Sequence, residues 1–243
     1  MRIPVFFLVA SLFIVDLAPA QTSELPVYRP ALIGNGPNAL INRIDTQDLM
    51  KKGQKDAALM FCCTVGKNGG IGWSGTYRAT PDSKLLEQEV QKKLAPATGP
   101  ALIPAIYHHQ PAEVIYYGTV IFKVADGKPR LRIFSNQETD ELKNEADFIS
   151  PQGLFGGESK FTGFHYPEQE SRLPVTGSAD DRMTIDADGN FQPATLIAEE
   201  PPFLGFGEAA LADFNSAKFI PAFRNGKPVA CEVTLPAFYK PTK

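Results

Sequence analysis

Alternation of apolar and polar residues marks several strands in the first half of the chain. Residues 57–65 and 71–78 alternate on either side of a Lys-Asn-Gly-Gly turn, a pattern that predicts a β-hairpin. Residues 112–124 form a longer apolar run, which an Asp-Gly turn joins to the alternating residues 130–135. The second half repeats this pattern in three predicted strands, residues 181–186, 191–198 and 229–237.

Three short helices are expected between these strands. Thr80 and Pro81 have the form of a helix start, a capping hydroxyl followed by a proline in the first turn. Leu86, Val90 and Leu94 then recur every four residues, which makes a narrow apolar stripe suited to packing on a sheet. The other two predicted helices are residues 46–52 and 208–216.

The two halves of the chain resemble each other in sequence. Residues 103–122 and 217–238 both contain Ile-Pro-Ala, a short turn, a proline seven residues after the first, and a strand-like run. Residues 63–79 and 183–198 both have the pattern of strand, Gly-bearing turn and strand, and 35 or 32 residues separate turn glycine from proline. Matching segments in the same order and at similar spacing indicate an internal duplication with a period of about 120 residues.

The second half also has the features of a known family. These are an Asp-x-Asp-Gly turn at residues 186–189, an alanine-bearing helix at 208–213, Phe-Ile-Pro-Ala at 219–222, Asn-Gly-Lys-Pro-Val at 225–229 and a closing strand at 231–238. Together, over residues 180–239, they resemble the C-terminal domain of TonB-family proteins, and residues 57–124 resemble a more degenerate copy. The resemblance implies an interaction module of the periplasm, not an enzyme.

The expected fold class is α+β, with two tandem small modules. Each module is predicted to be an antiparallel sheet of three or four strands with one main helix packed on one face, and the two are expected to form a pseudo-dimer. Aromatic residues in the connector predict that it packs on the modules. The expected boundaries are a signal peptide at 1–20, a Pro-rich N-terminal segment at 21–38, a first module at 39–135, a packed connector at 136–178 and a second module at 179–243.

The N-terminus predicts export to the periplasm or the medium. Arg2 precedes thirteen mostly apolar residues, and Ala18-Pro19-Ala20 fits a signal-peptidase site with cleavage after Ala20. Thirteen residues are short for a membrane span, although an uncleaved anchor stays open as the alternative. No other run in the mature chain is expected to cross a membrane. The formal net charge of −3 lacks the basic patch that nucleic-acid binding requires, so we expect no nucleic-acid partner.

Three cysteines are an odd number for an oxidising compartment. Alternation places Cys63 and Cys231 on the inward faces of their strands, where a thiol serves as a small buried hydrophobe. A disulfide between Cys63 and Cys231 would require the two modules to share a core, and it stays open as an alternative. Cys62 points to the opposite face of its strand.

The search for catalytic, cofactor and metal residues predicts none. His108 and His109 suggest a metal site, but the duplication aligns them with Asn225 and Gly226, the tip of a tight turn where adjacent side chains point apart. Residues 186–190 resemble a calcium loop but lack its sixth-position glycine and distal glutamate. A hydrolase would need a serine, a histidine and an acid to converge from positions that the sequence does not link.

We therefore expect an exported, non-enzymatic interaction or scaffolding protein of the cell envelope that binds an envelope protein by strand addition. The exposed edge of a sheet offers unpaired N–H and C=O groups to an extended peptide. The alternative is a small-ligand-binding protein that uses the aromatic connector and the groove between modules, favoured if four aromatic residues, Tyr107, Tyr116, Tyr117 and Phe155, converge on one pocket. The predicted partner-binding residues lie on or beside the last strand: Val229, Cys231, Val233, Thr234, Leu235 and Phe238.

Overall fold

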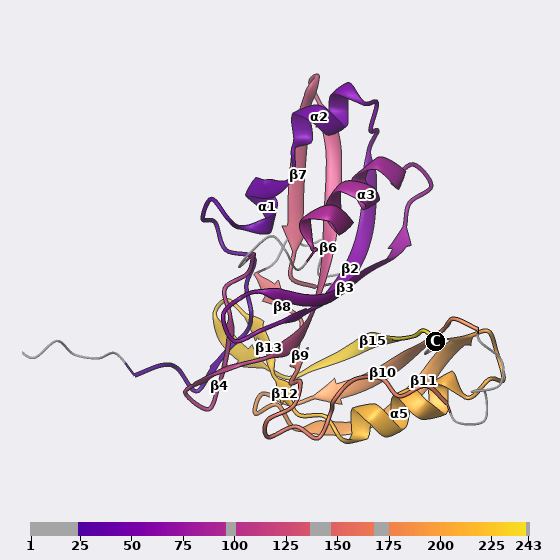
Figure 1. The fold of residues 1–243 in the computed structure, drawn as a ribbon. Helices are drawn as coiled ribbons and strands as arrows, with labels where there is room; N and C mark the ends of the chain where they lie inside the picture. The colour runs from indigo at the N-terminus through magenta and orange to yellow at the C-terminus, as the bar shows by residue number, and fades with distance from the viewer. Residues whose placement is uncertain (1–23, 96–100, 137–146, 168–174, 242–243) are drawn as a thin grey trace, which may run out of the picture.

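The computed structural model describes residues 24–95, 101–136, 147–167 and 175–241. The predicted signal peptide, residues 1–20, lies outside the described residues. Figure 1 shows two sheet-and-helix units, an upper one of indigo to pink segments and a lower one of orange to yellow segments. The protein therefore has a mixed α and β architecture with several antiparallel sheets and few helices.

The first unit is an antiparallel sheet with one helix packed across it. Its strands are β2 (Ala57–Val65), β3 (Ile71–Ala79), β6 (Val114–Ala125) and β7 (Lys128–Phe134), in the sheet order β3-β2-β6-β7. The helix α3 (Lys84–Lys93) places Leu86 and Val90 in a core that also contains Phe61 and Tyr116. The four-residue spacing of its apolar residues thus covers one face of the sheet, as the sequence predicts.

The second unit has the same plan with one strand fewer. Its strands are β10 (Gly177–Ile185), β11 (Phe191–Glu200) and β15 (Cys231–Tyr239), in the order β11-β10-β15. The helix α5 (Phe206–Asn215) buries Phe206, Ala210 and Phe214 in a core with Val233 and Leu235. In Figure 1, α5 lies on the side of this sheet that faces away from the first unit.

Each unit also contains a short hairpin between its helix and the long strand that follows, which is β6 in the first unit and β15 in the second. In the first unit β4 (Ala105–Tyr107) pairs with β5 (Gln110–Ala112), and β1 (Tyr28–Arg29) pairs with β4. In the second unit β13 (Ala222–Arg224) pairs with β14 (Lys227–Val229), and β8 (Phe148–Ile149) pairs with β13. Two further short strands, β9 (Gln152–Gly153) and β12 (Phe219–Ile220), pair with each other. A segment that precedes each unit therefore extends the hairpin of that unit.

Two short helices precede β2. They are α1 (Leu40–Arg43) and α2 (Thr46–Lys51), and both contact β7. Asp45 caps α2, since its Oδ1 accepts a hydrogen bond from the N–H of Asp48 at 2.9 Å. The predicted helix in this region is therefore confirmed. Within the described ranges, no helix has the length and apolar character that crossing a membrane requires.

The turn after the first long strand of each unit requires glycine for one shared reason. Gly69 and Gly189 both have a φ of +79°, a conformation that glycine adopts without the strain other residues incur. A Cβ at Gly69 would collide with the carbonyl of Leu102, and a Cβ at Gly189 would collide with the carbonyl of Phe219. In both units the turn thus packs directly against the chain that follows the helix.

The helix α3 begins later than the sequence predicts. The N–H of Thr80 donates to the Ala58 carbonyl at 2.9 Å, and its hydroxyl oxygen accepts from the Ala58 N–H at 3.1 Å. Thr80 therefore extends the pairing of β2 with β3 instead of capping a helix. Ser83 is the N-cap, without a side-chain hydrogen bond, and the helix starts at Lys84. Here pairing with a strand distant in sequence overrides a local capping signal.

Other boundaries also shift because strand pairing, not local pattern, ends an element. The predicted strand at residues 112–124 is divided, since Ala112 closes β5 and β6 starts at Val114. The predicted strand at 229–237 is divided in the same way between β14 and β15. The strand predicted from residue 181 begins at Gly177 because β10 pairs with β15 over that whole length.

The two units pack through the second face of the first sheet. Three residues on that face belong to the core of the second unit: Cys62, Ile115 and Tyr117. The hydroxyl of Tyr117 donates a hydrogen bond to the Pro236 carbonyl at 3.0 Å, and the rings of Tyr77 and Phe238 lie 5.0 Å apart. Arg78 forms an ion pair with Asp180 across the same boundary. Both faces of the first sheet are therefore covered.

All three cysteines are free thiols, so no disulfide joins Cys63 to Cys231. Cys63 is fully buried in the core of the first unit, as alternation predicts. Cys231 packs against the core of the second unit, on the predicted face, but it is only half-buried, so the prediction of a fully buried thiol there is wrong. It is the first residue of β15, where the sheet ends and fewer neighbours cover each side chain.

Candidate interaction site

The strand β15 lies at the edge of its sheet. It pairs with β10 from Cys231↔Ile185 to Tyr239↔Gly177, and no strand in the described part of the chain pairs with its other side. The corresponding strand of the first unit, β6, pairs with β2 on one side and with β7 on the other. On this side of β15, where the first unit adds β7 to β6, no described strand is paired, and the first unit packs against the strand near Pro236 and Phe238.

The structure places five of the six predicted partner-binding residues on β15. Val233 and Leu235 are 1% exposed and point toward α5, so only their backbone groups can contribute to an edge. Phe238 points the other way, toward the first unit, where its ring meets that of Tyr77. Val229 instead ends the neighbouring strand β14. The remaining two, Cys231 and Thr234, are half-buried.

Pro236 shows which backbone groups of β15 face the free edge. Its carbonyl accepts the hydrogen bond from Tyr117 Oη, so it points away from β10 and toward the first unit. Residues two apart on an antiparallel strand direct their backbone groups to the same side. Glu232, four residues earlier, therefore directs its N–H and C=O toward the free edge as well. Pro236 has no N–H to donate there, as proline on an edge strand requires.

A cavity of about 290 Å³ lies between this edge and the second face of the first sheet. Tyr117 and Phe155, two of the four aromatic residues expected to converge, both line it. Tyr107 instead lines a neighbouring, more polar cavity of about 380 Å³ together with Phe155, and Tyr116 is buried in the first core against Phe61. Two of the four predicted aromatic residues therefore line one cavity, and the other two do not. Ten residues line the first cavity: Cys62, Thr64, Trp73, Glu113, Ile115, Tyr117, Phe155, Gly163, Phe164 and Phe238.

Trp73 is a lining residue that the sequence interpretation missed. Its backbone N–H donates to Thr64 Oγ1 at 3.0 Å, next to a bulge in the pairing of β2 with β3. Its indole lies over Gly75, where a Cβ would be 3.3 Å from Cζ2 of the ring. Bulges often direct a side chain toward a functional site. The detectable signal was a lone tryptophan between two nearby glycines on a predicted strand.

The groups at the base of the cavity are uncharged at neutral pH. Burial raises the pKa of the Cys62 thiol well above its ordinary value, and the neighbouring Cys63 adds to this shift. Burial likewise raises the pKa of the Tyr117 hydroxyl. Glu113 is the single charged residue among the described residues that line the cavity. The cavity thus combines aromatic walls with one carboxylate.

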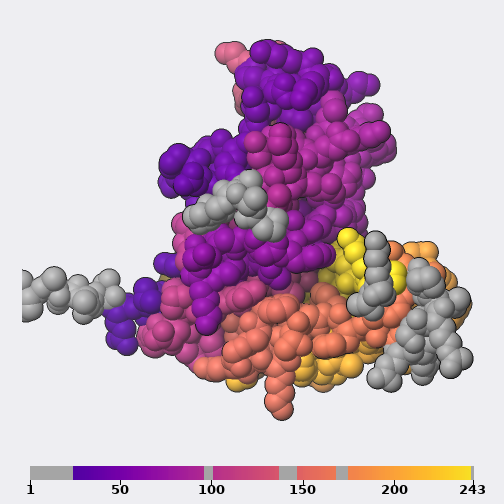
Figure 2. Space-filling view, viewed as in Figure 1, coloured from indigo at the N-terminus to yellow at the C-terminus, as the bar shows by residue number. Residues whose placement is uncertain are grey.

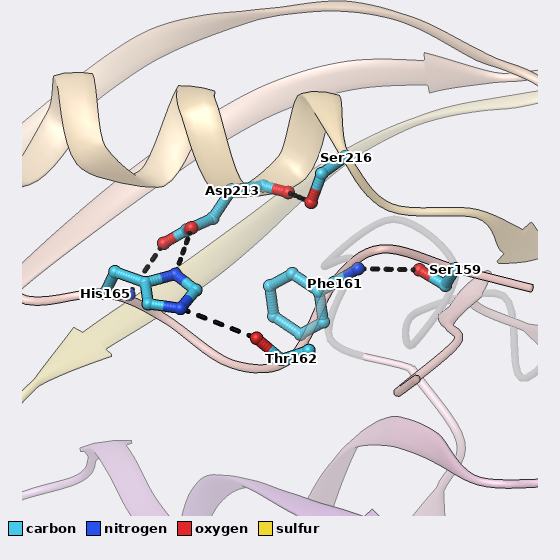
Figure 3. A network of polar contacts seen from close by, with 6 residues as sticks. All are labelled: Ser159, Phe161, Thr162, His165, Asp213 and Ser216. Carbon is cyan, nitrogen blue, oxygen red and sulfur yellow. Dashed lines mark hydrogen bonds and ion pairs between the residues drawn. The ribbon is translucent and has the colours of Figure 1, made fainter. Parts of the chain in front are cut away.

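A second polar arrangement joins the connector to the end of α5 (Figure 3). Asp213 accepts from the His165 backbone N–H at 2.8 Å and lies 2.6 Å from His165 Nδ1. Thr162 Oγ1 lies 3.5 Å from Nε2 of the same ring. The order of hydroxyl, imidazole and carboxylate is that of a hydrolase triad, but 3.5 Å is beyond the ordinary range of a hydrogen bond. We interpret the arrangement as a clamp that holds the connector against α5.

The two histidines of the first hairpin tip diverge. His108 and His109 have φ values of +46° and +63°, and Asn225 and Gly226 at the other tip have +51° and +72°. Nδ1 of His108 lies 3.5 Å from a Glu158 carboxylate oxygen. Nδ1 of His109 lies 3.8 Å from a carboxylate oxygen of a different residue, Glu24. Within the described ranges, His, Cys, Asp and Glu side chains form no group of three or more that could hold a metal ion.

The second unit is similar to a known protein family. Residues 162–241 match the family model described as Gram-negative bacterial TonB protein C-terminal. The match includes the second unit and the connector segment that packs on α5. The TonB C-terminal domain is a non-enzymatic protein-interaction domain of the cell envelope, found in the periplasm of Gram-negative bacteria. No curated protein matches the chain at a significant level.

Proposed function

We propose that this protein binds an extended segment of an envelope protein, which adds as a strand to the side of β15 that no described strand pairs with. The observation that carries the proposal is the difference between β15 and the corresponding strand of the first unit, β6. The strand β6 is completed by β7, with the register Thr119↔Phe134 to Ala125↔Lys128, whereas β15 has no such neighbour among the described residues. The pairing of β7 with β6 supports the proposal, because it is the kind of pairing that a partner strand would make with β15.

We further propose that the first unit is a degenerate second copy of the TonB C-terminal-like module, although the family model covers only residues 162–241. Support comes from the shared order of strand, turn, strand, helix, hairpin and strand. The matching collisions at Gly69 and Gly189 add to it. The two copies would then act as one scaffold, with the first copy holding the edge of the second.

The experiment that tests strand addition removes one backbone donor from the edge. In Glu232→Pro the N–H that points away from β10 is lost, whereas Glu232→Ala removes the same carboxylate and keeps the N–H. Wild-type residues 21–243 and both variants are used to capture proteins from an envelope extract, and circular dichroism confirms that each is folded. A protein captured by wild type and Glu232→Ala but lost with Glu232→Pro supports the proposal. A stoichiometric partner that Glu232→Pro retains contradicts it.

Binding of a small ligand is the second candidate function. The observation in its favour is that Tyr117 and Phe155 face one cavity of about 290 Å³, near the lower limit for small-molecule sites. Trp73 is the single tryptophan of the chain, so its fluorescence reports directly on this cavity. A small molecule that shifts this emission at micromolar concentration, and does so equally in Glu232→Pro, supports a ligand site independent of strand addition.

A further inference from the structure

The cavity lies directly beside the edge that a partner strand would join. Phe238, on β15, forms one wall, and Tyr117, whose hydroxyl bonds the Pro236 carbonyl, forms another. Figure 2 shows the yellow C-terminal residues at the surface where the two units meet. Successive side chains of a strand point to opposite faces of its sheet. Because Tyr117 already occupies the edge at Pro236, an added strand would pair with β15 on the N-terminal side of that contact, from Glu232. Every second side chain of that strand would point to the face of the sheet on which Phe238 borders the cavity.

The volume of the cavity suits one long side chain and not a whole peptide segment. At about 290 Å³ it is smaller than most sites for complete small molecules. Its walls are mainly aromatic, with rings from both units and from the connector. Aromatic faces accept the aliphatic stem of a lysine or arginine, and their negative π-faces attract its charge. An aliphatic side chain would gain the first of these two contributions but not the second.

The carboxylate of Glu113 favours a cationic side chain over an aliphatic one in this cavity. Its side chain is half-buried at the cavity, and it makes no ion pair with any other described residue. Its backbone is held in place, because its carbonyl accepts a hydrogen bond from the Phe155 N–H at 2.9 Å. A carboxylate on a fixed backbone beside aromatic rings favours a cation, since an incoming charge is paired as it leaves water.

We infer that this cavity selects partner segments that carry a lysine or arginine, whose stem packs between Trp73, Phe155 and Phe238 while its cationic group pairs with Glu113. The inference rests on the proposed function, because the segment that presents the basic residue is the strand added to β15. It deepens that function by stating what the partner segment contains. Specificity then comes from the cavity, and the backbone edge supplies affinity that does not depend on sequence.

The test uses three matched peptides with the wild-type protein, residues 21–243. Each is a short capped peptide of alternating valine and threonine whose central residue is arginine, citrulline or norleucine. Citrulline keeps the shape of arginine without its charge, and norleucine keeps only an aliphatic stem. Binding is measured from Trp73 fluorescence. We expect the arginine peptide to bind about tenfold more tightly than the citrulline peptide.

Two variants separate the cavity from the edge. Glu113→Gln is expected to remove the preference for arginine and leave citrulline binding unchanged. Ile197→Ala, which trims a 47% exposed side chain on β11 away from the cavity, is the matched control and should change nothing. Equal binding of the arginine and citrulline peptides, or an arginine preference that persists in Glu113→Gln, would overturn the inference.

Glu232→Pro distinguishes failure of the inference from failure of strand addition. If it weakens all three peptides and the arginine preference is retained, both ideas are supported. If it weakens them without any preference for arginine in the wild type, strand addition stands and the inference is wrong. If it has no effect while Glu113→Gln abolishes an arginine preference, the cavity selects cations but not from an added strand. Absence of binding by every peptide contradicts both ideas.

Discussion

In the first unit both faces of the sheet are covered, whereas in the second the face under α5 is covered and the other face is covered only in part, where it borders the first unit. Cys62 and Arg182 occupy corresponding positions, each seven residues before its turn glycine, and Tyr117 and Thr234 each lie thirteen residues after the first proline. Cys62 and Tyr117 are 2% and 3% exposed, while Arg182 is exposed and pairs with Glu232 at 3.6 Å. Corresponding positions of the two sheets thus pack against the neighbouring unit in the first unit and contact solvent in the second.

The cores differ at one position as sharply as the surfaces do. Eight residues before the turn glycine, the first unit has Phe61 and the second has Asp181. The Phe61 ring stacks on Tyr116, and it fits because a Cβ at Gly118 would lie only 2.8 Å from it. Asp181 is fully buried, and neither of its carboxylate oxygens has a hydrogen-bond partner within the described ranges. The second core therefore includes the free-energy cost of burying an unpaired carboxyl group, which the first core does not have.

The same comparison explains why strand addition is proposed for one half only. The first unit adds β7 beyond β6, whereas the equivalent side of β15 has no further described strand and lies beside an aromatic cavity. The side of β15 that corresponds to the β7 side of β6 is therefore where we propose that a partner strand adds.

The largest effect is expected from giving the first core the residue of the second. Phe61→Asp should destabilise the protein by about 4 kcal/mol or more, because it removes a buried ring and buries an unpaired carboxylate. The measurement is chemical denaturation at about pH 8, with Phe61→Ala as the control for lost packing alone. If Phe61→Asp costs no more than Phe61→Ala, the two cores tolerate charge equally and the comparison fails.

Asp181 should make stability depend on pH in the opposite sense to an ion-paired carboxylate. Burial, with a smaller contribution from the neighbouring Asp180, raises the pKa of Asp181 from 3.8 to about 7. The folded state therefore holds a proton that the unfolded state releases, and stability is lost as the pH rises from about 4 to about 7. This loss has an upper limit of about 4 kcal/mol.

Asp181→Asn tests this directly, since the amide keeps the shape of the side chain and cannot ionise. Unfolding free energies of the wild type and the variant are measured at about pH 5 and about pH 8. We expect the variant to gain stability relative to the wild type at the higher pH by about 2–4 kcal/mol. A wild type whose stability rises over this interval, with a variant that follows it in parallel, would exclude Asp181 as the source.

A smaller effect is expected where the first unit holds the edge of β15. Tyr117→Phe removes the hydroxyl that bonds the Pro236 carbonyl and should destabilise the protein by about 1–2 kcal/mol. Thermal unfolding gives the magnitude. Hydrogen exchange then shows where the structure is destabilised, because amides of β15 should exchange faster while those of β2 keep their protection. Tyr166→Phe, on the connector, provides a hydroxyl deletion away from the boundary between the units.

The smallest effect concerns the ion pair across that boundary. Arg78 and Asp180 have side chains that are 51% and 23% exposed, and exposed pairs contribute little. Arg78→Gln should lower stability by about 0.5 kcal/mol, and the effect should shrink as salt is added. A double-mutant cycle with Asp180→Asn isolates the pair. A coupling energy much above 1 kcal/mol would mean that charge, and not the apolar face, holds the units together.

Much of the local structure could be predicted from the sequence. The strands at β2 and β11, the helix α2 and the turn glycines were all predicted within a few residues. The inward orientation of Cys63 followed from alternation alone. These features depend on residues close in sequence, namely side-chain period, capping and the need for a positive φ, and such constraints can be seen without the fold.

Only the tertiary structure decided how the second face of the first sheet is used. Tyr117 and Pro236 are 119 positions apart, and no local pattern relates them. The same holds for the cavity, where Trp73, Glu113 and Phe238 come from three separate strands or loops. Alternation identifies two faces of a strand but not what covers each, because coverage depends on where a distant segment packs. The burial of Asp181 has the same origin, since α5 and β15 cover its side of the strand and no described residue offers its carboxylate a hydrogen bond.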